Sequence, residues 1–170
     1  MVITAHPPVS TRQIMEWLEQ VPDPEIPVIS VVDLGIVRDV TWEGATCVVT
    51  ITPTYSGCPA MGEITQDVIA MLQSRGLPDV RIETRLGPAW TTDWLSEKGR
   101  DALKGFGIAP PGQQAVDISS IIRRSDNLVV ECPLCNSSNT RLLSHFGSTP
   151  CKALYRCNGC GEPFDYFKAH

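Results

Sequence analysis

The chain contains no hydrophobic run long enough to cross a membrane. A membrane-spanning helix needs about 18 consecutive apolar residues, and no such stretch occurs among the 170 residues. Met1 to Ser10 also lacks the basic segment followed by an apolar segment that marks a secretory signal. We therefore expect a cytoplasmic protein with no membrane partner, in a compartment where thiols stay reduced. We interpret residues 1–10 as a flexible N-terminus.

Histidine is scarce, and the sequence patterns of redox enzymes are absent. The three histidines are His6, His145 and His170, and none follows a glutamate by three residues as the ligands of a di-iron oxygenase do. The chain has no Gly-x-Gly-x-x-Gly fingerprint for a flavin or nicotinamide cofactor, and no plant-type run of cluster-binding cysteines. A Cys–His nucleophile is poorly supported for the same lack of histidine. We predict no catalytic residues and a chain that is not an enzyme by itself.

Charge and cysteine are distributed unevenly along the chain. Residues 1–119 carry 8 basic and 15 acidic side chains with two of the seven cysteines, whereas residues 120–170 carry 6 basic and 4 acidic side chains with the other five. An Ala-Pro-Pro-Gly-Gln-Gln segment without apolar periodicity predicts a linker at 109–125. We therefore expect one unit at 11–108 and a second, smaller unit at 126–170.

The first unit shows a helix–strand–strand–helix–strand–helix pattern. Ser10 and Gln13 have the spacing of a capping box, which predicts a helix start. This order of elements predicts an α+β fold, in which helices cover one face of a short sheet. The expected elements are a helix ahead of Pro22, an extended stretch at 31–40, a strand at 47–52, a helix carrying Ile64 to Leu72, a strand at 80–86 and a helix from Thr92 to Gly105.

Two Cys-x-x-Cys pairs, separated by 21 residues, lie in the second unit. Two residues between cysteines let both sulfurs of one tight turn reach a single ion at about 2.3 Å, so two such knuckles form a tetrahedral site. Extended segments at 128–130 and 164–167 flank the pairs, as in a zinc β-ribbon. Four thiolates leave no open coordination position, so we expect the zinc to be structural. The expected zinc ligands are Cys132, Cys135, Cys157 and Cys160.

Two further residues between the knuckles do not fit the ligand spacing. Cys151 is either a small buried apolar residue or a free thiol that contacts a metal or a partner. We interpret His145 as a surface or packing residue.

The second unit also lacks the basic surplus of a nucleic-acid-binding surface. Its formal charge of +2 is offset by the charge of about −2 on a zinc–tetrathiolate centre. A surface that follows phosphates has to be basic. We therefore expect no nucleic-acid partner.

Cys58 lies in the loop between the second expected strand and the second expected helix. A thiol just ahead of a helix faces backbone N–H dipoles, which favours the thiolate, the form that binds soft metals and iron–sulfur clusters. An ordinary loop cysteine is an equal alternative, whereas Cys47, inside an apolar strand, belongs to the core. Asp23, Glu25 and Asp33 lie in loops of the same unit. They either shape turns, or one of them lies beside Cys58 as an oxygen ligand or a proton acceptor.

Three loops of the first unit resemble the signature of an iron–sulfur assembly domain family. The matching segments are Asp23–Pro27, Asp33–Val37 and Thr52–Pro59. The family includes bacterial SufT and the eukaryotic cytosolic iron–sulfur targeting factors, and the resemblance covers about residues 11–108. Together with the zinc ribbon and its Phe146–Tyr155 segment, the whole chain is similar to a family of accessory subunits of the bacterial phenylacetyl-CoA epoxidase system.

The resemblance implies a role in aerobic phenylacetate catabolism, where a multicomponent monooxygenase converts the ring of phenylacetyl-CoA to an epoxide. The implied partners are its di-iron oxygenase subunit and its iron–sulfur flavin reductase. Cys58 would be the metal- or cluster-handling thiol, and Asp23, Glu25 and Asp33 would belong to the loops around it. The implied cofactors are structural zinc and, transiently, iron or an iron–sulfur cluster. The alternative is a scaffolding subunit in which Cys58 has no function.

Overall fold

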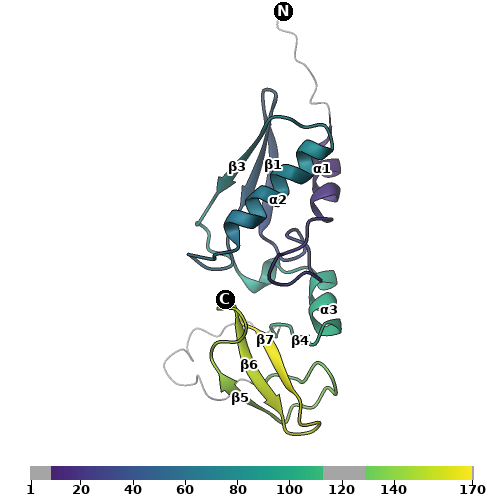
Figure 1. The fold of residues 1–170 in the computed structure, drawn as a ribbon, viewed down its shortest axis with the longest axis vertical. Helices are drawn as coiled ribbons and strands as arrows, with labels where there is room; N and C mark the ends of the chain where they lie inside the picture. Colours follow the sequence, from purple (N-terminus) through teal and green to yellow (C-terminus); the bar gives the residue numbers. More distant parts are fainter. Residues whose placement is uncertain (1–8, 113–128, 170) are drawn as a thin grey trace, which may run out of the picture. The chain divides into compact units, whose positions relative to one another are not determined.

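The computed structural model describes residues 9–112 and 129–169, and it divides the chain into two compact units (Figure 1). The first unit extends to Gly99 and the second begins at Arg100. The division therefore lies inside a helix, ahead of the linker expected at 109–125, of which only the part up to residue 112 is described.

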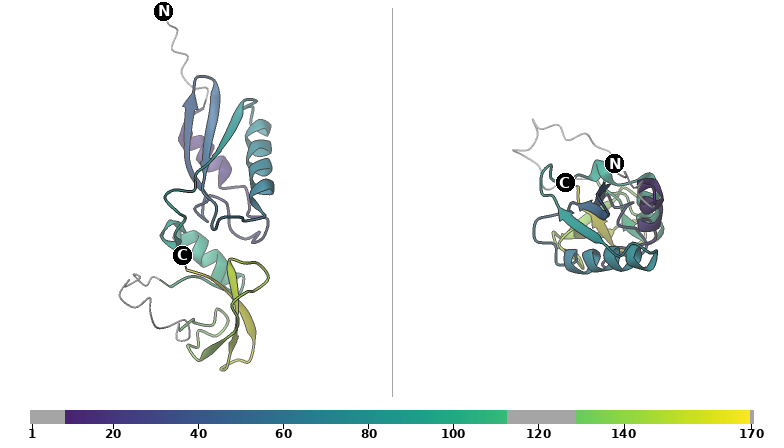
Figure 2. Two further views of the ribbon diagram at one scale, coloured as in Figure 1. Left: turned by 90° about the vertical axis from the view of Figure 1, so that its left-hand side faces the viewer. Right: turned by 90° about the horizontal axis from the view of Figure 1, so that it is seen from above.

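The first unit is a three-stranded sheet with two helices packed on it (Figure 2). The central strand β2 pairs antiparallel with β1 and parallel with β3, and α2 connects β2 to β3. The helix α1 contacts α2 and β1, while α2 also contacts β3. The elements are α1 (Thr11–Leu18), β1 (Val37–Glu43), β2 (Thr46–Ile51), α2 (Met61–Ser74) and β3 (Val80–Thr84).

The helix faces follow the apolar periodicity of the sequence. Ile14 and Leu18 of α1 are fully buried, and so are the corresponding residues of α2, which begin with Ile64. The Ser10 side chain accepts a hydrogen bond from the Gln13 N–H at 3.2 Å, which confirms the predicted cap. Cys47 is completely buried on β2, as predicted for a core residue.

Two elements of the first unit differ from the sequence prediction. Turns occupy residues 31–35 and the strand begins only at Val37, although the whole stretch 31–40 was predicted to be extended. The helix predicted from Thr92 is divided into a short 3₁₀ turn, η1 (Thr92–Trp94), and α3 (Glu97–Gly105). The Ser96 hydroxyl, and not Thr92, caps α3 by accepting from the Gly99 N–H at 2.9 Å.

The second unit contains a four-stranded sheet in the order β4-β7-β6-β5. The strand β4 (Ile108–Ala109) pairs parallel with β7 (Pro163–Phe167), so residues expected at the end of the first unit belong to the ribbon. The strands β5 (Thr140–Ser144) and β6 (Lys152–Cys157) pair antiparallel, as do β6 and β7.

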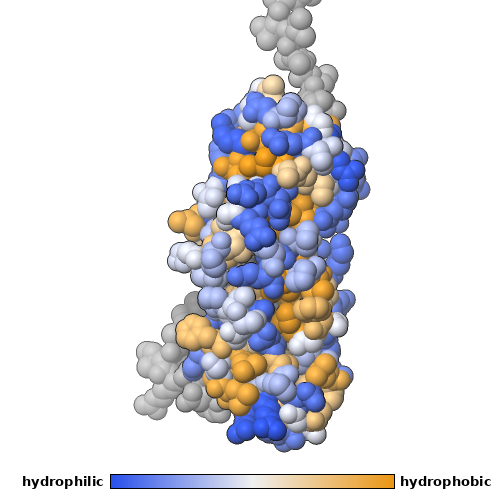
Figure 3. Space-filling model, in the orientation of Figure 1, coloured by the Kyte–Doolittle hydropathy of each residue, from blue (hydrophilic) through white to orange (hydrophobic). Residues whose placement is uncertain are grey.

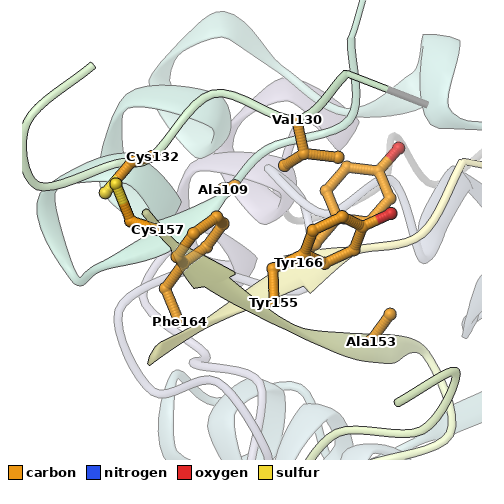
Figure 4. Close-up of a cluster of buried hydrophobic side chains, with 8 residues drawn as sticks. All are labelled: Ala109, Val130, Cys132, Ala153, Tyr155, Cys157, Phe164 and Tyr166. Atoms are coloured by element: carbon orange, nitrogen blue, oxygen red, sulfur yellow. The ribbon is translucent and has the colours of Figure 1, made fainter. Parts of the chain in front are cut away.

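The core of the second unit lies on one face of this sheet (Figure 4). The Tyr155 ring stacks on Phe164 and meets the Tyr166 ring edge-on, with centroids 5.9 and 5.6 Å apart. The strand predicted at 128–130 is wrong for its two described residues, which have no regular structure. Val130 is instead buried in this core, and its carbonyl accepts a hydrogen bond from the Thr140 hydroxyl at 2.6 Å.

None of the helices in the described part of the chain is long and apolar enough to span a membrane.

Candidate metal centre and thiol site

The four knuckle cysteines meet at one point of the second unit. Their sulfur atoms all lie within 4.8 Å of one another. The Cys132 and Cys160 sulfurs are 3.8 Å apart, and those of Cys135 and Cys157 are 3.5 Å apart. A tetrahedron with metal–sulfur bonds of about 2.3 Å has edges of about 3.8 Å. The arrangement therefore fits one tetrahedral metal ion, and Figure 4 shows two of these sulfurs side by side.

The hydrogen bonds of the knuckles show why a cation is needed there. The Gly159 and Cys160 N–H groups donate to the Cys157 sulfur at 3.3 and 3.4 Å, and the Cys160 N–H is the main reason that the pKa of Cys157 falls to about 6. Although the Ser137 N–H acts to lower the pKa of Cys135, contacts with the neighbouring thiols raise it to about 12. Thiols in contact cannot all ionise unless a metal ion balances their charge.

This centre is structural in character. All four corners are occupied by protein sulfur atoms, which leaves no position where a metal-bound water could be activated. Among the residues that the structure describes, this is the one group of three or more Cys, His, Asp or Glu side chains whose ligand atoms lie close enough to hold an ion.

Cys151 and His145 lie outside the four-sulfur group, as their spacing predicted. Cys151 is buried, and its sulfur lies 3.0 Å from the Thr149 hydroxyl oxygen. This position favours the interpretation of Cys151 as a small buried residue. His145 is exposed, and its backbone carbonyl accepts from the Lys168 ammonium at 3.1 Å.

Cys58 is half-buried in the loop that joins β2 to α2. Its N–H donates to the Tyr55 carbonyl and its carbonyl accepts from the Met61 N–H, both at 3.3 Å, so the thiol sits on a hydrogen-bonded turn. The first helical residue is Met61 and the cap position is Ala60, which places Cys58 two residues ahead of the cap.

The environment of Cys58 disfavours the thiolate, contrary to the sequence prediction. Burial raises the pKa of the thiol, and the negative charges of Glu25 and Asp23 raise it further. The Ala60 N–H and the Tyr55 hydroxyl act in the opposite direction but do not outweigh these effects. The N–H groups at the start of the helix thus compete with burial and with two carboxylates from another loop, which the local sequence does not reveal.

Asp23 combines both roles considered for it. Its carboxylate accepts hydrogen bonds from the Glu25 and Ile26 N–H groups at 2.9 and 2.8 Å, so it shapes the turn that carries Glu25. It also lies close enough to Cys58 for its charge to affect the thiol. The structure thus brings together Cys58, Asp23 and Glu25, which are about 30 positions apart in the chain.

Asp33 is engaged in a different network. Its carboxylate accepts from the Ser30 and Ser96 hydroxyls at 2.8 and 2.7 Å and pairs with Lys98 at 3.2 Å. Burial raises the pKa of Asp33, but these three hydrogen bonds together lower it below its usual value. Asp33 therefore fastens the segment at the start of α3, and the partners of its carboxylate are Ser30, Ser96 and Lys98 rather than the Cys58 loop.

Tyr55 is the residue near the thiol that sequence reasoning missed. Its hydroxyl is buried and hydrogen-bonds to Cys58, which lowers the pKa of the thiol. The signal in the sequence was an aromatic residue three positions before the cysteine in an otherwise small and polar loop. A thiol with two nearby carboxylates and a hydroxyl supplies both soft and hard donors, which suits iron better than purely soft metals.

The opposing influences on Cys58 make a testable pH dependence. Glu25→Gln removes a negative charge and should lower the pKa of the thiol, so alkylation by iodoacetamide at pH 8 becomes several-fold faster. Tyr55→Phe removes a donor to the thiolate and should slow it. Peptide mass spectrometry of metal-loaded protein, which follows Cys58 alone, measures both rates. Equal rates in both variants and wild type would contradict the described surroundings of the thiol.

Comparison with known proteins identifies both parts of the chain. Residues 11–84 match the family described as iron–sulfur cluster assembly protein, and residues 117–168 match the family described as PaaD zinc beta ribbon domain. A protein of Escherichia coli K12, whose name begins "Putative 1,2-phenylacetyl-CoA epoxidase" and designates it the D-type component, is 45% identical over 161 residues, which cover 95% of this chain and 94% of that protein.

The first unit also has relatives that consist of little else. The "Fe-S protein maturation auxiliary factor" of Porphyromonas gingivalis is 40% identical over 90 residues, covering 51% of this chain and 84% of that protein. The crystal structure of a domain of unknown function, DUF59, from Bacillus anthracis is 32% identical with a TM-score of 0.51, covering 55% of this chain and 90% of that one. The first unit therefore occurs without a ribbon, and the ribbon is an addition to it.

Proposed function

The chain belongs to the family of the PaaD-type components of 1,2-phenylacetyl-CoA epoxidase, and we propose that it is a non-catalytic accessory subunit of this multicomponent monooxygenase. In aerobic phenylacetate catabolism it assists the assembly or delivery of an iron or iron–sulfur centre to partner subunits. The observation that supports this proposal most is the half-buried Cys58 beside Glu25 and Asp23, in a domain shared with iron–sulfur maturation factors.

The surroundings of Cys58 suit a transient cargo. Two negative charges that oppose the thiolate favour a bound cation, because the cation offsets the repulsion between thiolate and carboxylates. When a cation enters, the thiol proton leaves to solvent or to a carboxylate such as Glu25. Since the described part of the chain gathers no compact third ligand there, the cargo keeps open positions, through which a partner can take it over.

The ribbon has a separate, structural role in this proposal. Cys132, Cys135, Cys157 and Cys160 bind zinc, which the tetrahedral all-sulfur geometry fits. Zinc has no redox chemistry and the site has no open position, so the ribbon contributes a folded surface and not a reaction. The partners are the di-iron oxygenase and the iron–sulfur flavin reductase of the epoxidase system.

Substitution of Cys58 distinguishes the assembly role from a purely scaffolding role. We expect Cys58→Ser to reduce the epoxidase activity and the iron content of co-expressed partner subunits by at least about tenfold, while complex formation stays intact. Ser56→Ala, an exposed residue of the same loop, is the matched control and should behave as wild type. Activity and iron content of Cys58→Ser within twofold of wild type would favour a scaffolding subunit.

A further inference from the structure

The β5–β6 hairpin of the second unit carries an unusual pair of charges. Arg141 and Arg156 are directly opposite each other in the antiparallel pair, so both exposed side chains lie on the same face of the sheet. Like charges in this position destabilise a sheet. Neither guanidinium forms an ion pair with a described carboxylate, and Arg156 reaches only the Gly161 carbonyl, at 3.2 Å. The hairpin therefore carries a cost in stability that its own fold does not offset.

Exposed hydrophobic side chains occur on the same hairpin. Leu143 is 46% exposed at a β-bulge, where the pairing shifts between Leu142 and Ser144. Bulges redirect side chains out of the regular pattern. Phe146, in the loop between β5 and β6, is 68% exposed. On the face shown in Figure 3, hydrophobic residues generally reach the surface in small groups between hydrophilic ones.

The loop that presents Phe146 is tightly held. The Lys168 ammonium lies 4.8 Å from the Phe146 ring centre and donates to the neighbouring His145 carbonyl. The Gly147 N–H donates to the Lys152 carbonyl at 2.8 Å, and a Cβ on Gly147 would lie only 2.6 Å from an Asp165 carboxylate oxygen. The exposed ring is thus fixed by its surroundings, as in an anchor residue of an interface.

The charge around this ring is positive. Asp165 is already paired with Lys152 at 3.7 Å and accepts from the Ser148 hydroxyl at 3.2 Å. Lys168 faces the ring and not a carboxylate, and the two arginines are close in the sheet. We propose that Arg141, Leu143, Phe146, Arg156 and Lys168, the hairpin surface, dock a partner protein that presents carboxylates around an apolar pocket.

The edge position of β5 supports a protein partner. In the order β4-β7-β6-β5 this strand has no further strand on its outer side among the described residues. Bulges and charged side chains protect such edges from indiscriminate pairing. The hairpin surface combines both devices with an aromatic anchor, which suits a selective contact. This docking role depends on family membership and not on the role of Cys58.

The test uses full-length, zinc-loaded protein and each of the other epoxidase subunits as the probe. Biolayer interferometry at low and high salt should show binding to one subunit that weakens with salt. Phe146→Ala should weaken it by at least about tenfold. Leu86→Ala, an equally exposed residue of the first unit, should leave it within twofold. Binding by no subunit, or equal binding by all variants, would overturn the proposal.

Arg141→Glu separates a docking role from a structural one. It replaces two opposed positive charges by a cross-strand ion pair, so the melting temperature should rise by about 1 to 4 °C. Binding of the partner should nevertheless fall by at least about tenfold. A lower melting temperature, or unchanged binding, would contradict the proposal, and so would a wild-type dimer that Phe146→Ala dissociates, because a second copy would then occupy the surface. Cys58→Ser should bind normally, so failure of docking and failure of the assembly role are distinguishable.

Discussion

Cys132→Ser should release the metal of the ribbon and unfold the second unit while the first unit stays folded. Cys132 is completely buried, and its sulfur lies within 4.8 Å of the other three. Binding of zinc to such a site is worth about 10–16 kcal/mol in zinc-finger peptides, and this binding energy is also folding energy. A unit this small cannot replace the loss by apolar burial. Zinc analysis and hydrogen exchange resolved by peptide measure both consequences.

The extent of the unfolding is itself a prediction. Because β4 pairs with β7, the amides of Ile108 and Ala109 should lose protection together with those of the ribbon. The amides of α1 and β2 should keep theirs. Cys151→Ala is the matched control, since this buried cysteine lies outside the four-sulfur group, and it should retain zinc. Retention of zinc and of protected amides in Cys132→Ser would contradict a metal-dependent fold.

Gly35→Ala should destabilise the first unit by about 2–5 kcal/mol. The residue has a φ of +76°, which is unfavourable for alanine, and a Cβ there would lie 2.7 Å from the Trp94 carbonyl oxygen. That oxygen is backbone and cannot move away cheaply, so strain from overpacking adds to the conformational cost. Urea unfolding of the full chain, followed by first-unit tryptophan fluorescence, measures the loss.

Gly44→Ala isolates the conformational part of this effect. Gly44 has a similar φ of +62°, but a Cβ there would meet nothing within 4 Å. We expect a loss of about 1–2 kcal/mol for this variant. Equal losses at Gly35 and Gly44 would show that the contact with Trp94 has no energetic weight.

These glycine predictions explain why the Asp33-Leu34-Gly35 segment matters in the sequence. Each of its residues holds the stretch before α3: Asp33 accepts from Ser96, the Leu34 carbonyl accepts from the Trp90 indole at 3.0 Å, and Gly35 packs on Trp94. The resemblance placed Asp33 near the thiol. The contacts of this structure give it a positioning role for the chain, and a direct role at Cys58 stays without support.

Local patterns allowed much of this structure to be predicted. The cap at Ser10 and the apolar faces of the helices depend on neighbours three or four residues apart, which a sequence shows directly. The two knuckles were predictable because two-residue spacing fixes the position of both sulfurs. The buried position of Cys47 followed from its apolar strand.

Features that depend on distant contacts were not predictable. The strand β4 has only two residues and exists because β7 pairs with it, about 57 positions later. The shift of the helix start from Thr92 to Glu97 depends on Ser96, which both caps α3 and binds Asp33. The raised pKa of Cys58 depends on burial and on carboxylates from a loop more than 30 positions earlier, and local helix geometry pointed the other way.

The most direct test of the assembly role is the iron content of the protein beside that of Cys58→Ser. Both proteins are purified and reconstituted with ferrous iron and sulfide under anaerobic conditions, and metal analysis is combined with a visible absorption spectrum. We predict one zinc per chain in both, with iron and a thiolate-to-iron charge-transfer band that only Cys58→Ser lacks. One zinc in both and no iron in either, or equal iron in both, would contradict the proposal that Cys58 carries the cargo.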